Sequence, residues 1–191
     1  MKYYDILPFV HHLLSQLIQP GDTAIDATAG NGHDTLYLAS LVGEKGRVHS
    51  FDIQEQALTN TTQKLQEHEV YSRVNLHHAG HEQLKKKIDQ EEWPQVKAAI
   101  FNLGYLPGGD KSIVTTADTT ITALQTLKSS LSPGSVILLV VYHGHEEGKQ
   151  ERDELMSYVQ SLNPVDIQVA KYEFMNQTNN PPFLLIMERK G

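Results

Sequence analysis

Two glycines inside a run of small and acidic residues are the first candidates for chemistry. The run from Ile25 to Thr35 is IDATAGNGHDT, in which Gly30 and Gly32 follow an acid at position 26. Glycines at such a turn allow backbone torsions and a close approach that a Cβ would block. Asp52 lies twenty residues after Gly32, at the end of the predicted strand RVHSFD, and is placed to accept hydrogen bonds from a ribose diol. The combination predicts a nucleoside site.

The acidic residue before the glycines discriminates between nucleoside ligands. A dinucleotide site carries G-x-G-x-x-G, whereas the last position of that pattern is Thr35 here. Asp26 would repel a pyrophosphate, but it could orient a cationic aminoacyl group directly or through water. S-adenosylmethionine contains ribose, adenine, a sulfonium and an amino acid but no phosphate, so the loop favours this cofactor. An ordinary strand-to-helix turn is the alternative.

The segment from Phe101 to Lys111, FNLGYLPGGDK, is the predicted acceptor site. Asn102 and the backbone carbonyls after it offer acceptors that can hold an amine with its lone pair facing a methyl group. Tyr105 could stack on a planar substrate, beside a turn at Pro107-Gly108-Gly109. A plain loop is the alternative. The predicted catalytic residues are Asn102 and Tyr105. The predicted substrate-binding residues are Leu103, Gly104, Tyr105, Pro107, Gly108, His143, His145 and Asn180.

Ten histidines invite a metal site, but they are scattered and lack helical H-x-x-x-H or H-E-x-x-H spacing. We therefore predict no metal. In HHAGH, residues 77–81, either His78 or His81 is placed to contact an adenine ring. The loop 176–182, NQTNNPP, is either a simple turn or a cover for the substrate pocket. The predicted cofactor-binding residues are Asp26, Thr28, Gly30, Asn31, Gly32, Asp34, Thr35, Asp52, Ile53, His81 and Asn102.

Alternating strands and helices must position these groups. Apolar spacing and turn residues predict helices near 6–18, 34–41, 55–67, 116–131 and 146–162. Seven apolar segments, beginning with TAIDAT and ending with PFLLIMER, predict strands. The βαβ order indicates a mainly parallel sheet, and the last two strands, which have no helix between them, indicate one antiparallel strand. The expected fold class is α/β, Rossmann-like, with a seven-stranded sheet.

Length, charge and composition limit the number of domains, the partners and the kinds of site that this chain can have. The 191 residues suit one domain, 1–191. The net charge of −7 argues against binding to nucleic acid by bulk charge, although a local basic patch near Lys85–Lys87, Lys111 or Arg152 is compatible with it. The absence of Cys excludes disulfides, thiolate metal sites and a catalytic thiol in this chain. With no long apolar run and no export signal, a cytoplasmic location away from membranes is expected.

These motifs resemble a known family. DATAGNGHDT from Asp26, FDI from Phe51, NLGYLPGGDK from Asn102, YHGHEEG from Tyr142 and NPP from Asn180 look like the small bacterial proteins once labelled rRNA methylases and now understood as MnmM tRNA methyltransferases. The resemblance covers nearly the whole chain. It implies a class I methyltransferase that uses S-adenosylmethionine to methylate the amine of 5-aminomethyl-2-thiouridine at the tRNA wobble position, yielding 5-methylaminomethyl-2-thiouridine.

The residues themselves leave other functions open. Methylation at carbon 5 of a pyrimidine generally needs a Cys nucleophile, so its absence favours N- or O-methylation. A methyltransferase for another RNA or a small amine fits the motifs equally well as far as Asp52. A nucleotide-binding module without catalysis is disfavoured because Asn102 and both glycines are present. The expected partner is tRNA rather than DNA, and a homodimer is compatible with it.

Overall fold

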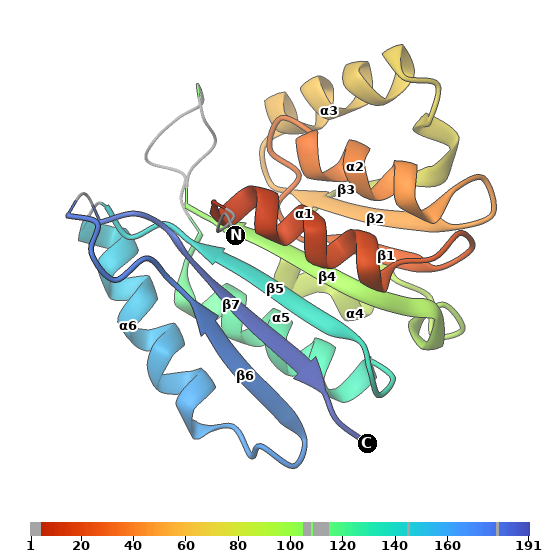
Figure 1. The fold of residues 1–191 in the computed structure, drawn as a ribbon. Helices are drawn as coiled ribbons and strands as arrows, with labels where there is room; N and C mark the ends of the chain where they lie inside the picture. Colours follow the sequence, from red (N-terminus) through yellow and green to blue (C-terminus); the bar gives the residue numbers. More distant parts are fainter. Residues whose placement is uncertain (1–4, 105–107, 109–114, 145, 179) are drawn as a thin grey trace.

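A seven-stranded sheet runs through the protein with the strand order β3-β2-β1-β4-β5-β7-β6 (Figure 1). The computed structural model describes residues 5–104, 108, 115–144, 146–178 and 180–191. All neighbouring strands are parallel except that β7 is antiparallel to both β5 and β6. The predicted sheet with an antiparallel last strand is confirmed. The strands are β1 (Thr23–Asp26), β2 (Arg47–Asp52), β3 (Val74–His78), β4 (Val96–Leu103), β5 (Val136–Val141), β6 (Ile167–Tyr172) and β7 (Phe183–Arg189).

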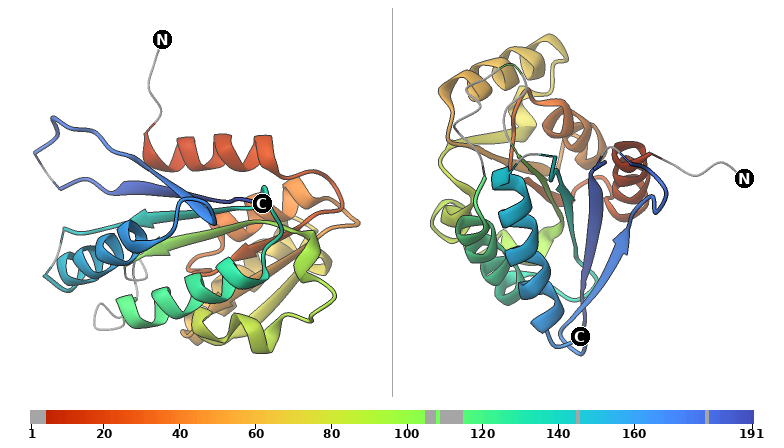
Figure 2. Two further views of the ribbon diagram at one scale, coloured as in Figure 1. Left: turned by 90° about the horizontal axis from the view of Figure 1, so that it is seen from below. Right: turned by 90° about the vertical axis from the view of Figure 1, so that its left-hand side faces the viewer.

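Helices cover both faces of the sheet, with α1, α2 and α3 on one side and α4, α5 and α6 on the other (Figures 1 and 2). Short helix α4 is not among the five predicted helices, although the end of a solvated helix is the default interpretation of the Lys85–Lys87 run that it contains. The other five coincide with predicted helices to within one or two residues. The helices are α1 (Ile6–Leu17), α2 (His33–Val42), α3 (Glu55–Glu67), α4 (Leu84–Lys87), α5 (Ala117–Ser130) and α6 (Glu146–Ser161).

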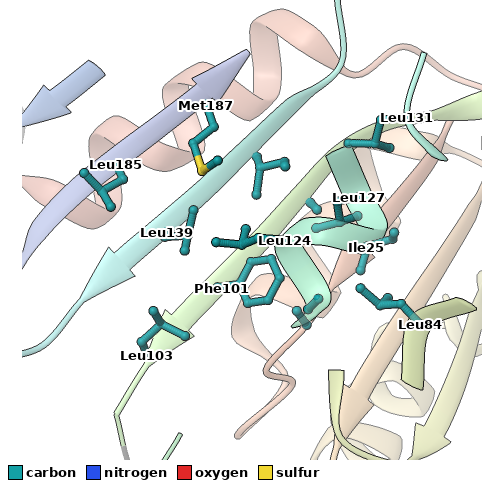
Figure 3. Close-up of a cluster of buried hydrophobic side chains, with 14 of the residues drawn as sticks. Ile25, Leu84, Phe101, Leu103, Leu124, Leu127, Leu131, Leu139, Leu185 and Met187 are labelled. Atoms are coloured by element: carbon teal, nitrogen blue, oxygen red, sulfur yellow. The ribbon is translucent and has the colours of Figure 1, made fainter. Parts of the chain in front are cut away.

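The sheet separates the core into two apolar clusters, one on each of its faces. All six residues of β5 are buried, as expected for a strand covered on both faces. Successive residues of β5 enter opposite clusters: Leu139 packs with α5, and Leu138 packs on the side of α1 and α2. Figure 3 shows the α5-side cluster, where Phe101 of β4 lies beside Leu124 (Figure 3). The same alternation directs Asn102 toward α1 and α2.

The described residues contain no helix long and apolar enough to cross a membrane.

Candidate functional site

A cavity of about 380 Å³ opens where β1, β2 and β4 end. The carboxyl ends of parallel strands meet at this edge, which is where open α/β sheets bind ligands. Its volume lies within the range of small-molecule and cofactor sites. Asp52 and Glu82 place carboxylates on the wall, and no Lys or Arg lines it among the described residues. The lining residues are Ala27, Thr28, Gly30, Phe51, Asp52, Ile53, Gln54, Ala79, Gly80, His81, Glu82, Asn102, Gly104, Thr115, Thr116 and Thr119.

The glycine turn is held from two sides. Gly30 N donates to Asp52 Oδ2 over 2.9 Å, and Thr61 Oγ1 of α3 donates to the Gly30 carbonyl over 3.2 Å. A Cβ on Gly32 would lie 2.9 Å from the Thr61 Cα, and Gly32 has a φ of +76°. Asn60 donates to the Asn31 side chain over 2.9 Å. Glycine at position 32 is therefore required both by its backbone conformation and by the approach of α3.

Asp52 joins the turn to the end of β2. One carboxylate oxygen accepts from Gly30 N, and the other accepts from Gln54 N over 2.9 Å. A carboxylate has about four acceptor positions, so these two bonds leave capacity for a ligand. Ile53 beside it lines the cavity with 55% of its surface exposed. Asp52 can therefore accept hydrogen bonds from a diol, and the neighbouring Ile53 offers an apolar surface to a ring of the same ligand.

Asp26 lies beneath the turn, fully buried, and does not line the cavity. It accepts hydrogen bonds from Thr35 Oγ1 over 2.6 Å and from Thr28 N over 3.1 Å. Burial, with a smaller contribution from the nearby Asp34 charge, raises the pKa of Asp26 to about 7. In these contacts Asp26 and Thr35 shape the loop from below. A direct contact of Asp26 with a cofactor stays a prediction.

Of the two histidines proposed for the adenine ring, His81 lines the cavity and His78 does not. His81 Nδ1 lies 3.1 Å from the Ala27 carbonyl, which it can reach only as a donor, and Nε2 lies 3.4 Å from Thr120 Oγ1. Burial lowers the pKa of His81, which favours a neutral ring. A neutral imidazole held on both sides suits the wall of a pocket for an uncharged ring system.

Asn102 presents an unsatisfied acceptor. Its backbone N donates to Thr28 Oγ1 over 2.7 Å, and its side-chain Nδ2 donates to Asp34 Oδ2 over 2.5 Å. Its side-chain oxygen Oδ1 is buried and has no hydrogen-bond partner. Buried polar atoms are nearly always paired, so an unpaired acceptor on a residue that lines the cavity indicates a place where a ligand donates.

The remaining predicted residues are only partly gathered around the cavity. Gly104 lines it, whereas Leu103 is buried in the core and Gly108 is exposed. His143 is buried with Nε2 unpaired, its ring 5.5 Å from that of Phe183, and does not line the cavity. Asn180 is exposed with a φ of +46°. Tyr105, Pro107 and His145 lie outside the described residues, as does Lys111.

Sequence reasoning missed several groups of this site. Glu82, Gln54 and three threonines after the acceptor loop line the cavity without any motif to mark them. His11 of α1 contacts Asp34 through a 2.7 Å hydrogen bond between residues 23 positions apart. Periodicity predicts the helix that carries His11, but nothing in the sequence indicates what that side chain contacts.

Sequence comparison matches this chain to proteins named as RNA methyltransferases. The family model described as "Putative rRNA methylase" matches residues 48–188. The chain is 37% identical to a protein of Arabidopsis thaliana named "tRNA (mnm(5)s(2)U34)-methyltransferase, chloroplastic", over 95% of this chain and 68% of that protein.

Solved structures share both sequence and fold with this chain. A "putative rRNA-methylase" from Clostridium thermocellum is 41% identical, with a TM-score of 0.95 over 99% of this chain and all of that one. A "putative methyltransferase" from Streptococcus mutans, solved in complex with SAH, is 36% identical, with a TM-score of 0.88 over 98% of this chain and 99% of that one.

Proposed function

The chain belongs to the rRNA methylase family, and from that membership we propose that it methylates the amine of 5-aminomethyl-2-thiouridine at the tRNA wobble position, using S-adenosylmethionine. The Arabidopsis relative is named for methyl transfer at this tRNA position, which supports the substrate. The single structural observation that carries the proposal is the buried, unpaired Oδ1 of Asn102, a residue that lines the cavity. A primary amine is the kind of donor that this acceptor lacks.

The cavity fits S-adenosylmethionine better than a phosphate-containing nucleotide. Asp52 and Glu82 give the wall negative charge, and no cation lines it among the described residues. Such a wall attracts a sulfonium or an ammonium and repels a pyrophosphate. Asp52 would hold the ribose, while Ile53 and His81 would border the adenine. When bound, the cofactor supplies an electrophilic methyl group, and a structure of the Streptococcus mutans relative contains SAH.

The protein's own contribution is to hold the amine neutral and aligned. An ammonium has no lone pair and cannot attack, so the acceptor must lose a proton before transfer. Asn102 Oδ1 accepts a hydrogen bond from the amine without adding a charge that would favour the ammonium form. The amine nitrogen then has its lone pair free for the methyl carbon. No covalent bond from protein to base is needed, in keeping with a chain that has no Cys.

Further parts of the proposal concern the rest of the chain. We assign Gly104, Gly108 and Asn180, with Tyr105, Pro107 and His145, to the side of the site that receives the base, and the buried Leu103 and His143 would support that side from within the protein. Residues 1–191 would form a single methyltransferase domain. With tRNA as its substrate the enzyme would act in the cytoplasm, and a homodimer would enlarge the surface that meets the RNA.

Nucleoside mass spectrometry tests the substrate. Cells that lack the protein should accumulate 5-aminomethyl-2-thiouridine in tRNA, and the purified protein with S-adenosylmethionine should convert that tRNA to the methylated form. Wild-type tRNA, already methylated, is the matched control and should accept no further methyl group. An unchanged nucleoside profile, or methyl transfer to ribosomal RNA or small amines in place of tRNA, would contradict the proposal.

A further inference from the structure

Three side chains from three elements are joined by two hydrogen bonds, and the last of the three is Asn102, the proposed acceptor for the substrate amine. His11 Nε2 of α1 lies 2.7 Å from Asp34 Oδ1 of α2, and Asn102 Nδ2 of β4 lies 2.5 Å from Asp34 Oδ2. Asp34 is nearly buried, with 13% of its side chain exposed, and does not line the cavity. Its contacts therefore lie within the protein.

The chemistry of a carboxylate decides the direction of both bonds. An ionised carboxylate only accepts hydrogen bonds, so His11 must donate through Nε2–H and Asn102 must donate through its NH₂ group. An amide that turns its NH₂ toward Asp34 turns its oxygen the other way. This oxygen is the buried Oδ1 that has no partner. Of the two orientations of the Asn102 amide, Asp34 thereby selects the one that leaves the oxygen free to accept a hydrogen bond.

His11 is itself held in place. Its ring stacks on Tyr37 of α2, with centroids 4.1 Å apart and planes 17° apart, and Tyr37 Oη donates to the His11 carbonyl over 2.9 Å. Val10 and Leu14 of the same helix are fully buried against the sheet. Helix α1 thus presents His11 to Asp34 from a fixed position.

We propose that His11 is a positioning residue for methyl transfer: it fixes the Asp34 carboxylate, which in turn holds the Asn102 amide with its oxygen toward the acceptor amine. This inference rests on the proposed function for the identity of that amine. Without His11, one oxygen of Asp34 loses its donor, so the carboxylate can rotate and Asn102 samples the wrong amide orientation. His11 affects the reaction only through Asn102.

Single-turnover methylation of tRNA from cells lacking the protein provides the first test. His11→Ala should lower the rate roughly 3- to 10-fold, the effect of one net hydrogen bond. The S-adenosylmethionine affinity should stay unchanged, and the melting temperature should fall by only about 2–4 °C, since the ring also stacks on Tyr37. His11→Gln, which keeps an N–H donor at a similar reach, should restore most of the rate. His12→Ala, which removes the exposed neighbour on the same helix, is the matched control and should behave as wild type.

A double-mutant cycle distinguishes positioning from an independent role. If His11 acts through Asn102, His11→Ala should cost nothing further in an Asn102→Ala background. Additive losses would overturn the proposal. So would a wild-type rate for His11→Ala, or a failure of His11→Gln to restore the rate.

Nuclear magnetic resonance of the side-chain amide tests the same inference without tRNA. The Asn102 NH₂ signal, identified by its loss in Asn102→Ala, should show a slowly exchanging, hydrogen-bonded proton in the wild type and faster exchange in His11→Ala. Unchanged exchange would overturn the positioning role. If the wild type leaves the tRNA unmethylated, the proposed function fails, while the amide signal still decides the role of His11.

Discussion

The amide of Asn102 combines two properties that no charged side chain offers. Its nitrogen donates to Asp34, and its oxygen remains a neutral, buried acceptor. A carboxylate at the same place could not donate to Asp34 and would stabilise an ammonium. Asp26 shows the opposite use of burial, since its carboxyl serves the loop and not the cavity. What each of these side chains can do for a ligand therefore depends on which of its atoms already has a hydrogen-bond partner within the protein.

Asn102→Asp should therefore lower kcat by roughly 10- to 100-fold, the effect of one charge-assisted hydrogen bond. The new carboxyl would face that of Asp34, and the two would compete for one proton. Asn102→Ala should also lose activity, and wild-type activity should rise with pH as the amine loses its proton. Calorimetry should show nearly unchanged cofactor affinity for both variants. Wild-type turnover by Asn102→Asp would contradict this account of amine alignment.

Asp52→Ala should weaken S-adenosylmethionine binding by roughly tenfold or more, because a hydrogen bond to a charged acceptor is worth about 1.5–3 kcal/mol. Isothermal calorimetry measures this directly. Thermal melting serves as a control, since Asp52 also holds the backbone of Gly30 and Gln54. Equal affinity in a folded variant would remove Asp52 from the site, and equally strong NAD binding would contradict the cofactor assignment.

Asp26 should make stability depend on pH in an unusual direction. Burial raises its pKa to about 7, so between about pH 4 and 7 the folded protein keeps a proton that the unfolded chain releases. Its contribution to the free energy of unfolding is greatest at low pH and is lost as the pH rises through this window. Relative to Asp26→Asn, the wild type should lose about 2–3 kcal/mol between pH 5 and 7.

Urea unfolding of both proteins across that pH range gives the difference. His49, His77 and His81, whose pKa values are lowered by burial, are present in both proteins and cancel. A difference that stays constant with pH would show that Asp26 titrates at its ordinary pKa.

The glycine turn and helix α3 work as one unit. Asn60 and Thr61 of α3 hold the side chain of Asn31 and the carbonyl of Gly30, while Gly32 leaves room for the Thr61 backbone. The turn keeps its shape because an element later in the chain packs against it. The position of the cavity wall therefore depends on α3, although α3 starts beyond the motif.

Gly32→Ala should destabilise the protein by about 3 kcal/mol, of which left-handed strain contributes about 1–2 and overpacking the rest. Gly134→Ala is the matched control, because Gly134 has a similar φ of +83° and no atom within 4 Å of its Cβ position. Chemical denaturation should show the control losing only the strain contribution. Equal losses in the two variants would mean that the approach of Thr61 adds nothing.

For the molecule as a whole, one edge of the sheet collects chemistry from distant parts of the chain. Residues after β1, β2 and β3 and at the end of β4 line one cavity, and α1 is linked to it through His11, Asp34 and Asn102. Two apolar clusters, one on each face, keep the central strands rigid beneath it. Within the described part of the chain, no group of His, Cys, Asp and Glu is arranged to hold a metal ion.

From the spacing of its histidines, which lacks the helical pattern of a metal site, we predict that methyl transfer needs no bound metal. Enzyme treated with a chelator, then freed of it before addition of tRNA folded with magnesium, should keep its full rate. The treatment is confined to the enzyme because the RNA needs its own counterions. A loss of activity that a single metal restores would contradict this prediction.

The sequence by itself determined the elements and much of the cavity. Apolar periodicity and the Gly and Pro breaks marked seven strands and five helices, because local spacing decides which face of an element is buried. The parallel order then brought Gly30, Asp52 and Asn102 to one edge, since parallel strands end together. These three residues do line the cavity.

Only the tertiary structure decided what the polar groups at this edge contact. Asp34 lies 23 residues from His11 and 68 from Asn102, so no local pattern records that one carboxylate joins them. The same holds for Gly32, whose neighbour Thr61 belongs to α3, and for Asp26, which is turned into the core. Hydrogen-bond partners depend on distances of a few tenths of an ångström between separately packed elements, and residue spacing does not contain that information.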